Sequence, residues 1–478
     1  MSKQSDKEAG QEIFERAHKD LIAGNIDVSE RAFNYLLDRN IQNPDLWFYS
    51  GTCQLKRGFN AVAELMFKKC LEIDKNSVAA LNNLGTLCKQ QQRKDEAESY
   101  FRKALKFFPK NCEPEVEREL GGIWNNLSTL YIENGTPDKA IEYCNAGLKY
   151  QPASPQLLWN RALAHLEKKE WEAGWYGYDS GFKSEDGKRK DKPYSGNIPH
   201  WDGSPGMTVI IYGEQGLGDE ILFSSMIDDA SRRASIIIDA HPRLANIFRN
   251  SFPGIPIYGT RKDNETPWTE LFKIDARCAI GSLGKLFRKK DSDFPMRERY
   301  LFADKRISEK YREKLSLLGN RPKIGISWKG GYPSTGKKIR SIDLKQWGPI
   351  LSIDADFISL QYTSKADEEA IEAEEFHGIK IHHWQDTIDD YDETAGLVDN
   401  LDLVVTITTS IAHLAGAMGK KTLVLTPSKN NWNWGLSGSE MIWYPSITLF
   451  RQIGNDWNPV IRKISEEICH LFQKTTAA

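Results

Sequence analysis

The chain has 478 residues, of which 40% are hydrophobic and 27% are charged, and its formal net charge is −2. These values are typical of a globular protein with about two to four domains. They argue against a general polyanion binder, so no nucleic-acid partner is expected.

The cysteines and the first residues indicate the compartment. Seven cysteines occur without a C-x-x-C pair, which is typical of free thiols under reducing conditions. The start, MSKQSDKEAGQEIFERAHKD, lacks the apolar segment of a signal peptide, and no run of about 18 apolar residues occurs. The sequence therefore predicts a cytoplasmic protein without a transmembrane segment.

A repeat occupies the first third of the chain. Large and small residues recur at an offset of 34, the period of tetratricopeptide repeats: Trp47, Gly51, Ala63 and Phe67 correspond to Leu81, Gly85, Ala97 and Phe101. The second of these copies adds Leu84, Ala104 and Pro109. A third copy is displaced by 43 residues, with nine extra residues near Asn111 to Glu119, and contains Trp124, Leu127, Tyr131, Ala140 and Pro152. Degenerate first and last copies are expected at Glu12 to Arg39 and Pro155 to Tyr178.

Residues 10–182 are thus predicted to form an α-helical tetratricopeptide-repeat solenoid, whose concave face holds a polypeptide segment. The sequence does not identify the residues of that face, and the array could instead only support the next domain. Residues 183–206 are a predicted linker. Its part from Ser184 to Lys192 is charged and expected to be exposed, and its part from Ile198 to Gly206 is expected to dock the chain onto the next domain.

From Met207 onward, apolar runs alternate with amphipathic segments, as in α/β folds with parallel sheets. The expected strands are Val209–Tyr212, Ile236–Asp239, Ile255–Tyr258, Ile324–Trp328, Phe357–Gln361, Lys380–His382, Leu403–Ile407 and one beginning with Leu423–Leu425. A helix at Ile307–Leu318, followed by Arg321 and Pro322, marks a boundary between two doubly wound halves, residues 207–318 and 319–478. A ligand would lie in the cleft at the carboxyl ends of their strands.

A glycine loop comes after the first of these strands. It reads GEQGLGDE, and Gly213, Gly216 and Gly218 flank Gln215 in it. Glycines let a backbone turn tightly or approach a ligand. Asp219 stands at the start of the expected helix Ile221–Ala230, where it is either a general base facing the cleft or a helix N-cap.

A second polar turn comes after the strand Leu403–Ile407. Its hydroxyls come from Thr408, Thr409 and Ser410, and a helix of small residues begins there and carries His413. Free backbone N–H groups at the positive end of a helix suit a phosphate. The alternative is an ordinary capped βαβ unit with a surface histidine.

A dinucleotide-dependent oxidoreductase is an alternative function, because a glycine loop, a helix and then Asp239 outline a dinucleotide-binding unit. The glycine spacing is G-x-x-G-x-G rather than G-x-G-x-x-G. A single nucleotide-binding unit also does not need the second anion-type turn, so this function is disfavoured.

Taken together, these segments resemble a known family: tetratricopeptide-repeat proteins with a C-terminal domain of the heptosyltransferase type (glycosyltransferase family 9), which includes flagellin glycosyltransferases. The resemblance covers about Trp47 to Ile464. The matching segments, in order, are WEAGW, WDGSPG, EQGLGDEILF, GISWKGG with RSIDL, SLQY, DNLDLVV, SIAHLAGAMGK, NWNWG, WYPSITLFRQ and DWNPV.

The resemblance implies a GT-B fold with two Rossmann-like halves, and inverting transfer from a nucleotide-activated sugar without a metal or other cofactor. It makes Asp219 the general base. It assigns the donor phosphate to the turn with Ser410, Ile411 and His413, and assigns donor binding also to Lys329 and Arg340, whose alternative is a solvated loop. The acceptor implied for the repeats is a Ser or Thr hydroxyl of a protein such as flagellin.

One departure from the family concerns the second turn. Where the family has V-D-T-[SA], this chain has Ile407, Thr408, Thr409 and Ser410, so Thr408 replaces an acid. A non-catalytic scaffold with a degenerate domain is therefore an alternative to an enzyme, and a lipid or saccharide acceptor is a further one.

The tail is rich in aromatic residues, for which packing is expected over sugar or base stacking; they are Trp432, Trp434, Trp443, Tyr444 and Trp457. The amphipathic segment Ile461–Phe472 would, by the family's fold, form a terminal helix that crosses back to the first half.

Overall fold

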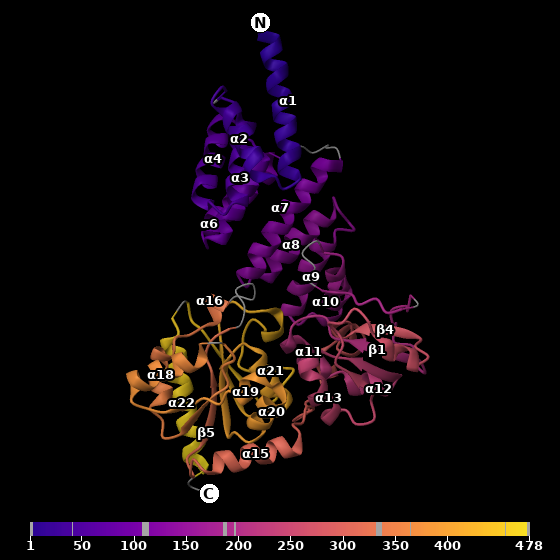
Figure 1. The fold of residues 1–478 in the computed structure, drawn as a ribbon, viewed down its shortest axis with the longest axis vertical. Coiled ribbons are helices and arrows are strands. Elements are labelled where there is room, and N and C mark those ends of the chain that lie inside the picture. Colours follow the sequence, from indigo (N-terminus) through magenta and orange to yellow (C-terminus); the bar gives the residue numbers. More distant parts are fainter. Residues whose placement is uncertain are drawn as a thin grey trace. The chain divides into compact units, whose positions relative to one another are not determined.

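The structure is a computed structural model that describes residues 3–40, 42–107, 114–184, 189–195, 197–330, 337–363, 365–454 and 456–475. The chain divides into two compact units, Met1–Arg161 and Ala162–Ala478, and the division falls inside one helix, α9 (Figure 1). Pro109 of the repeat pattern and residues 331–336 of the loop before Arg340 lie outside the described residues.

The first unit consists of helices that pack in consecutive antiparallel pairs. The helices are α1 (Lys3–Ile22), α2 (Ile26–Leu37), α3 (Pro44–Lys56), α4 (Asn60–Ile73), α5 (Val78–Gln90), α6 (Lys94–Phe107), α7 (Pro114–Glu133), α8 (Pro137–Leu148) and α9 (Pro155–Glu167). The pairs have the phase that the repeat pattern predicts. The helix α7 begins within the stretch of extra residues, so part of that insertion lengthens a helix.

A glycine–phenylalanine contact explains the repeat. A Cβ atom on Gly51 would lie 2.9 Å from the Phe67 ring, and one on Gly85 would lie 2.6 Å from the Phe101 ring. Both rings are fully buried. The first helix of each pair therefore needs a residue without a side chain at the point where the ring of the second helix crosses it.

The second unit begins with the end of α9 and contains two parallel sheets. The first half has the strands β1 (Thr208–Tyr212), β2 (Ser235–Asp239), β3 (Ile257–Tyr258) and β4 (Ala276–Ala279), and the helices α10 (Trp171–Tyr178), α11 (Leu217–Ser224), α12 (Ile227–Ser231), α13 (Ala245–Ser251) and α14 (Gly284–Phe287). The second half has the strands β5 (Lys323–Ser327), β6 (Asp356–Ser359), β7 (Ile381–His382), β8 (Leu403–Ile407), β9 (Thr422–Thr426) and β10 (Ile447–Arg451). Its helices are α15 (Lys305–Ser316), α16 (Lys337–Arg340), α17 (Gly348–Leu351), α18 (Ala366–His377), α19 (Asp386–Asp389), α20 (Tyr391–Asp399), α21 (Ser410–Ala417) and α22 (Asn458–Thr475).

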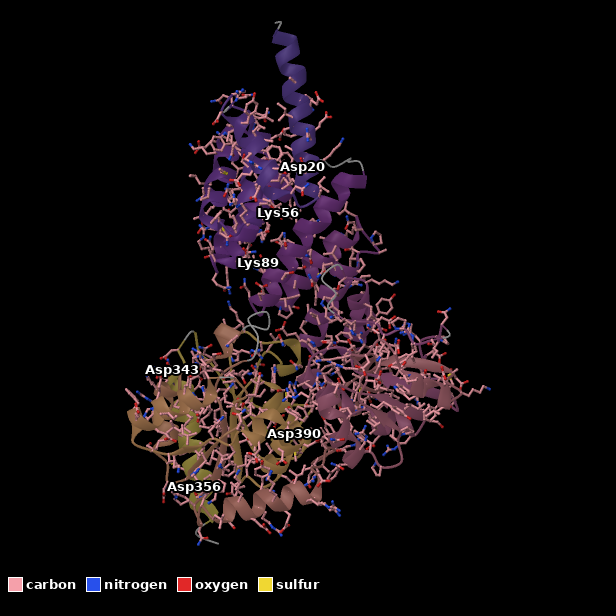
Figure 2. All side chains as sticks on the ribbon, viewed as in Figure 1. Asp20, Lys56, Lys89, Asp343, Asp356 and Asp390 are labelled. Atoms are coloured by element: carbon pink, nitrogen blue, oxygen red, sulfur yellow. The ribbon has the colours of Figure 1, made fainter. Side chains whose placement is uncertain are left out.

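The strand orders are β3-β2-β1-β4 and β10-β9-β8-β5-β6-β7. These are the doubly wound orders of Rossmann-like sheets, in which the chain reverses direction across the sheet after its first three strands. The reversal lies between β1 and β4 in the first sheet and between β5 and β8 in the second. In Figure 2, Asp356 marks the amino end of β6, low in the view, and Asp343 lies higher in the view. Ligands of such sheets bind outside the carboxyl ends of the strands at the reversal.

Two strands were not expected from the sequence. β4 reads ARCA, and Arg277 at its centre makes it look polar, but the guanidinium forms an ion pair with Asp191. β10 reads ITLFR and pairs in parallel with β9. The expected helix Ile221–Ala230 is also corrected, because α11 begins four residues earlier, at Leu217, and the chain turns between α11 and α12.

The boundary between the two halves differs from the one expected at Arg321. The helix α15 packs against α20 of the second half, and the Tyr311 hydroxyl donates to Asp386 at 2.8 Å. Earlier in the chain, the Tyr300 and Leu301 amides already donate to the Ala417 carbonyl. The chain thus enters the second half near Tyr300. The helix α15 that follows belongs to this half, because it packs against α20.

The terminal helix is the other correction to the expected arrangement. The helix α22 packs against α17, β9 and β10, and its Ile461, Ile464 and Ile468 are buried in the core of the second sheet. The stronger contacts of α22 among the described residues are all with elements of the second half, not with the first half as expected. Within the same described part of the chain, no helix is long and apolar enough to cross a membrane.

Residues 162–182 were assigned to the repeat array but pack within the second unit. The Trp171 indole donates to Asp291 at 2.6 Å, and the Trp175 indole donates to the Arg288 carbonyl at 2.7 Å. The WEAGW segment is therefore an integral part of the α/β unit rather than the end of an independent solenoid.

Candidate active site

The two polar turns that the sequence singles out meet in the structure. The glycine loop comes after β1 and starts α11, and the second turn comes after β8 and starts α21, so both stand at the reversal points of their sheets. The helices α11 and α21 pack together. A Cβ atom on Gly218 would lie 2.8 Å from His413 Cδ2, so only glycine allows this approach.

Asp219 lies in the first turn of α11. Its Oδ2 accepts a hydrogen bond from the Gly216 amide at 3.2 Å, so Gly216 is the N-cap and Asp219 stands three residues later. The side chain remains partly accessible. Burial in the surrounding protein raises the pKa of Asp219 to about 6, against the lowering effect of the Gly216 hydrogen bond, and the neighbouring Glu214 adds to the rise. A carboxylate with such a pKa can accept a proton near neutral pH.

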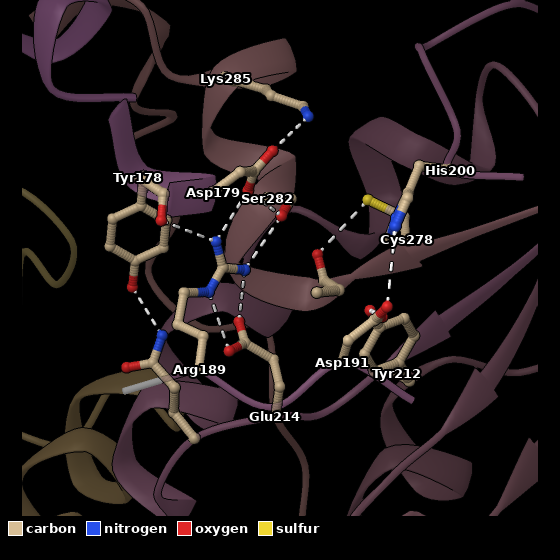
Figure 3. A network of polar contacts seen from close by, with 12 residues as sticks. Tyr178, Asp179, Arg189, Asp191, His200, Tyr212, Glu214, Cys278, Ser282 and Lys285 are labelled. Atoms are coloured by element: carbon tan, nitrogen blue, oxygen red, sulfur yellow. Dashed lines mark hydrogen bonds and ion pairs between the residues drawn. The ribbon is translucent and has the colours of Figure 1, made fainter. Parts of the chain in front are cut away.

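Buried charges hold the glycine loop in place (Figure 3). Arg189 donates to both carboxylate oxygens of Glu214, at 2.7 and 3.0 Å, and both side chains are fully buried. Gln215 donates to the Tyr178 hydroxyl at 2.7 Å, and Arg261 donates to the Gln215 carbonyl at 2.6 Å. The sequence predicts that Ser184–Lys192 is an exposed charged segment. In the structure its Arg189 is buried, because it forms an ion pair with the buried carboxylate of Glu214.

Glu220, the residue after Asp219, has a structural role. Its carboxylate accepts from the His241 amide at 2.7 Å and from Arg261 at 2.5 Å. A Cβ atom on Gly213 would lie 2.1 Å from this carboxylate, so the first glycine of the loop leaves room for Glu220. Of the two adjacent acids, only Asp219 is partly accessible.

The turn after β8 contains buried hydroxyls. Thr409 is the N-cap of α21, and Thr408 and Thr409 are 2% and 5% exposed. Within the described ranges, neither hydroxyl oxygen has a hydrogen-bond partner. Buried polar groups are nearly always paired, so two adjacent unpaired hydroxyls at a helix N-terminus point to a missing polar partner.

His413 is buried, in contrast to the surface position that its alternative interpretation requires. The Nδ1 atom lies 3.1 Å from the Tyr444 hydroxyl, and the ring lies 4.8 Å from that of Trp434. Burial, with a further contribution from Arg340, lowers the pKa of His413 to about 3. The imidazole is therefore neutral at physiological pH and can offer a hydrogen bond but no charge.

The two cations proposed for donor binding differ in position. Arg340 donates to the Thr408 carbonyl at 2.5 Å, so its guanidinium lies at the second turn. Lys329 forms an ion pair with Glu369 of α18 at 2.6 Å. The Gln361 side chain bonds the Lys329 backbone at both its amide and its carbonyl. Only Arg340 is thus brought to the turn by a hydrogen bond of the described residues.

Asp239 is the acid on which the dinucleotide alternative depends, and it is fully buried. Its Oδ2 accepts from Lys192 and from the Tyr194 hydroxyl, both at 2.7 Å, and its Oδ1 accepts from the Thr260 amide and hydroxyl. Both oxygens are occupied by protein donors, so Asp239 is not placed to bind a ribose.

The aromatic residues of the tail mainly pack. Trp432 contacts the rings of Trp175, Tyr178 and Phe223, and Trp443 contacts those of Phe294 and Trp171. Trp457 belongs to the core of the second sheet. Trp434 differs, because it covers His413.

Two residues that sequence reasoning missed belong to the site: Arg189 and Arg261. Each bonds the glycine loop from a distant part of the chain, and no local pattern marks it. Tyr444, for which packing is expected from the sequence, also bonds His413. For a metal, the described residues offer no group of three or more His, Cys, Asp or Glu side chains that could hold the ion.

The repeat unit has a polar row of its own. Asn126 donates to Asn82 at 2.9 Å, and Asn160 donates to Asn125 at 2.7 Å. Each pair links the first helix of one helical pair to the first helix of the next. Asn160 is buried and also lies within hydrogen-bond distance of the Ser128 and Thr129 hydroxyls, whereas Asn82, Asn125 and Asn126 are partly exposed and can bond further polar partners.

These observations define a chain of tetratricopeptide-type helical pairs followed by an α/β unit with parallel sheets. Models of the tetratricopeptide repeat match residues 78–111 and 121–154. The chain is also similar to Protein FlbA of Caulobacter vibrioides, with 29% identity over 342 residues that cover 66% of this chain and 56% of FlbA. The match thus spans little more than half the length of that relative.

Solved structures also resemble part of the chain. The match to a crystal structure of MamA covers 38% of this chain and 94% of the MamA chain, with 19% identity and a TM-score of 0.31. The match to the pilF protein of Pseudomonas aeruginosa covers 52% of this chain and 94% of the pilF chain, with 16% identity and a TM-score of 0.36. At these scores the resemblance has no bearing on function.

Proposed function

We propose that the chain is a protein O-glycosyltransferase of GT-B fold that moves a sugar from a nucleotide donor to a Ser or Thr hydroxyl. The observation that carries this proposal is the turn after β8, where the buried hydroxyls of Thr408 and Thr409 have no partner among the described residues. Arg340 bonds the same turn, and α11 with Asp219 packs against the helix that begins there. An anionic donor group would satisfy this turn.

In the proposed reaction, Asp219 removes the proton from the acceptor hydroxyl, whose oxygen attacks the anomeric carbon of the sugar. The bond from that carbon to the phosphate oxygen breaks, its electron pair leaves with the nucleotide phosphate, and the anomeric configuration inverts. Arg340 and the N–H groups of Ser410 and Ile411 stabilise the negative charge that develops on the phosphate. His413, being neutral, adds a hydrogen bond.

The substitution of Thr408 for the family's acid has a physical consequence in this scheme. A carboxylate next to the donor phosphate would repel it, whereas a hydroxyl can donate to it. Binding of the phosphate therefore does not require an acid at this position, and the substitution is compatible with transfer.

The acceptor is proposed to be a polypeptide held by the repeat unit. Asn82, Asn125 and Asn126 are partly exposed and carry amide groups of the kind that bond a peptide backbone, whereas Asn160 is buried and holds Asn125 in place. Flagellin is the acceptor that the family resemblance suggests.

A non-catalytic scaffold is the second candidate, and the loss of an acid at Thr408 is what favours it. A lipid or saccharide acceptor is a further alternative for an active enzyme. In the scaffold the repeats bind a partner, and the α/β unit binds a nucleotide without turnover or binds nothing.

The test is a thermal-shift screen of the purified chain against UDP-, GDP-, ADP-, dTDP- and CMP-sugars, followed by mass analysis of an acceptor protein incubated with the stabilising donor. A selective rise in Tm that is lost in His413→Ala, together with a mass increase of the acceptor, is expected. Loss of one hydrogen bond from the neutral imidazole to the charged phosphate weakens binding by about 1–3 kcal/mol. A donor that binds without any transfer would support the scaffold, and the absence of a shift with every donor would contradict the proposed site.

A further inference from the structure

We propose that Arg189 and Tyr178, which precede the first sheet in the chain, position the glycine loop and through it Asp219 for proton transfer. This inference rests on the proposed function. It assigns a role in the reaction to a segment that the sequence marks only as the end of a repeat and a charged linker.

Arg189 is held on every side. Its guanidinium forms the two bonds to Glu214, donates to Asp179 at 2.8 Å and donates to Ser282 at 2.9 Å. The rings of Tyr178 and Phe182 lie 4.4 and 4.1 Å from its central carbon. Figure 3 shows the guanidinium at the centre of this network, with Lys285 bonded to the outer oxygen of Asp179. Such a bidentate, stacked arginine has one orientation.

The network reaches the reacting group through a short length of chain. Glu214 and Gln215 are the second and third residues of the glycine loop, and they are bonded by Arg189 and Tyr178, respectively. Gly216 then starts α11, and its amide donates to Asp219. The backbone between the anchored residues and Asp219 therefore has little freedom, and displacement of the loop would displace the carboxylate.

The Arg189–Glu214 pair could instead only stabilise the fold. A variant that removes one partner would not distinguish the two roles, because it leaves the other charge buried and unpaired. The double variant Arg189→Met/Glu214→Leu avoids this by removing both charges and keeping apolar volume. Arg288→Met/Asp229→Leu is the matched control. That pair is also an arginine–carboxylate contact of the first half, at 2.8 Å, with Arg288 buried and Asp229 partly buried. Its arginine donates to the Ser225 carbonyl instead of holding the glycine loop.

The experiment measures donor KM, kcat and hydrogen exchange of the peptide spanning Gly213–Asp219. The Arg189/Glu214 variant should lower kcat by about 10- to 100-fold, the scale of a misplaced reacting group, with donor KM nearly unchanged and faster exchange in the loop. The control should change none of these quantities. Wild-type values of both kcat and loop exchange in the Arg189/Glu214 variant would overturn the inference.

A milder variant covers the case in which the double variant does not fold. Tyr178→Phe removes only the hydroxyl that accepts from Gln215, and it should speed exchange at Gln215 and Gly216 and lower kcat by a few-fold. Absence of transfer by the wild-type chain would be a failure of the proposed function. Unchanged loop exchange in both variants would instead be a failure of this inference.

Discussion

The turns at the two sheet reversals are built in opposite ways. In the loop after β1, Glu214 and Gln215 have their polar groups bonded by protein partners, including two arginines. In the turn after β8, Thr408 and Thr409 are buried, and their hydroxyls have no partner among the described residues. The polar groups of the first turn are bonded by protein partners, whereas the second turn leaves two buried hydroxyls that a ligand could bond. The contrast suggests that the first half supplies a preorganised reacting group and the second half binds the charged substrate.

The largest expected effect comes from the reacting group. Asp219→Asn keeps an oxygen that can accept from Gly216 but cannot take a proton, so kcat should fall by about 10²- to 10⁴-fold. The measurement is transfer to the acceptor under saturating donor. Because burial raises the pKa of Asp219 to about 6, wild-type activity should decline as the pH falls below about 6.

Asp293→Asn is the control for the loss of a capping carboxylate. Asp293 also stands three residues after an N-cap in a short helix, and it lies outside the site. Equal activities of the Asp219 and Asp293 variants would show that Asp219 serves only as a cap.

The second-largest expected effect is on donor affinity, and it distinguishes Arg340 from Lys329. Arg340→Met should weaken donor binding by about 10- to 100-fold, because it removes a charged group at the second turn. Lys329→Met should leave donor affinity nearly unchanged, since Lys329 pairs with Glu369. Titration calorimetry with the stabilising nucleotide measures both. A loss of affinity that is larger in the Lys329 variant would reverse the assignment.

A smaller effect is expected from the unpaired hydroxyls, with opposite signs for stability and binding. Thr408→Val and Thr409→Val remove buried groups without partners, so Tm should stay or rise, while donor affinity falls by about 3- to 10-fold. Thr406→Val is the matched control, because that buried hydroxyl bonds the Ile407 carbonyl. Its loss should lower Tm and leave affinity unchanged. A lowered Tm in the Thr408 and Thr409 variants would mean that these hydroxyls have protein partners.

The smallest effect concerns the stability of the first turn. The pKa of Asp219 is higher in the folded state, at about 6, than its ordinary value of 3.8, so the folded state binds this proton more tightly. Stability contributed by the protonated form is present below about pH 4 and is lost as the pH rises through 6. Asp219→Asn should therefore have the higher Tm at pH 8 and no advantage at pH 4. Equal differences at both values would contradict the raised pKa.

Much of this architecture can be predicted from local signals in the sequence. The 34-residue period marks the helical pairs because Gly51 and Gly85 each face a buried phenylalanine ring. The strands β1 and β8 are mostly buried apolar residues, and the polar turns that follow them stand out by contrast.

Other features depend on contacts between distant parts of the chain. Arg189 lies in a run of charges that looks solvated, and only the folded sheet brings Glu214 to it. The helix α15 comes before the second sheet in sequence, yet it packs on α20. Neither the order of elements nor residue type predicts such contacts. Arg189 pairs with Glu214, and α15 packs on α20, because the folded chain brings these distant groups together.

Hydrogen exchange with and without the stabilising nucleotide tests the contrast between the two turns most directly. The account predicts strong new protection in the peptide spanning Thr408–Met418 and little change in the peptide spanning Gly213–Asp219, which is already held by Arg189, Tyr178 and Arg261. Protection confined to other segments, or equal protection of both turns, would contradict the division between a preorganised turn and a ligand-binding turn.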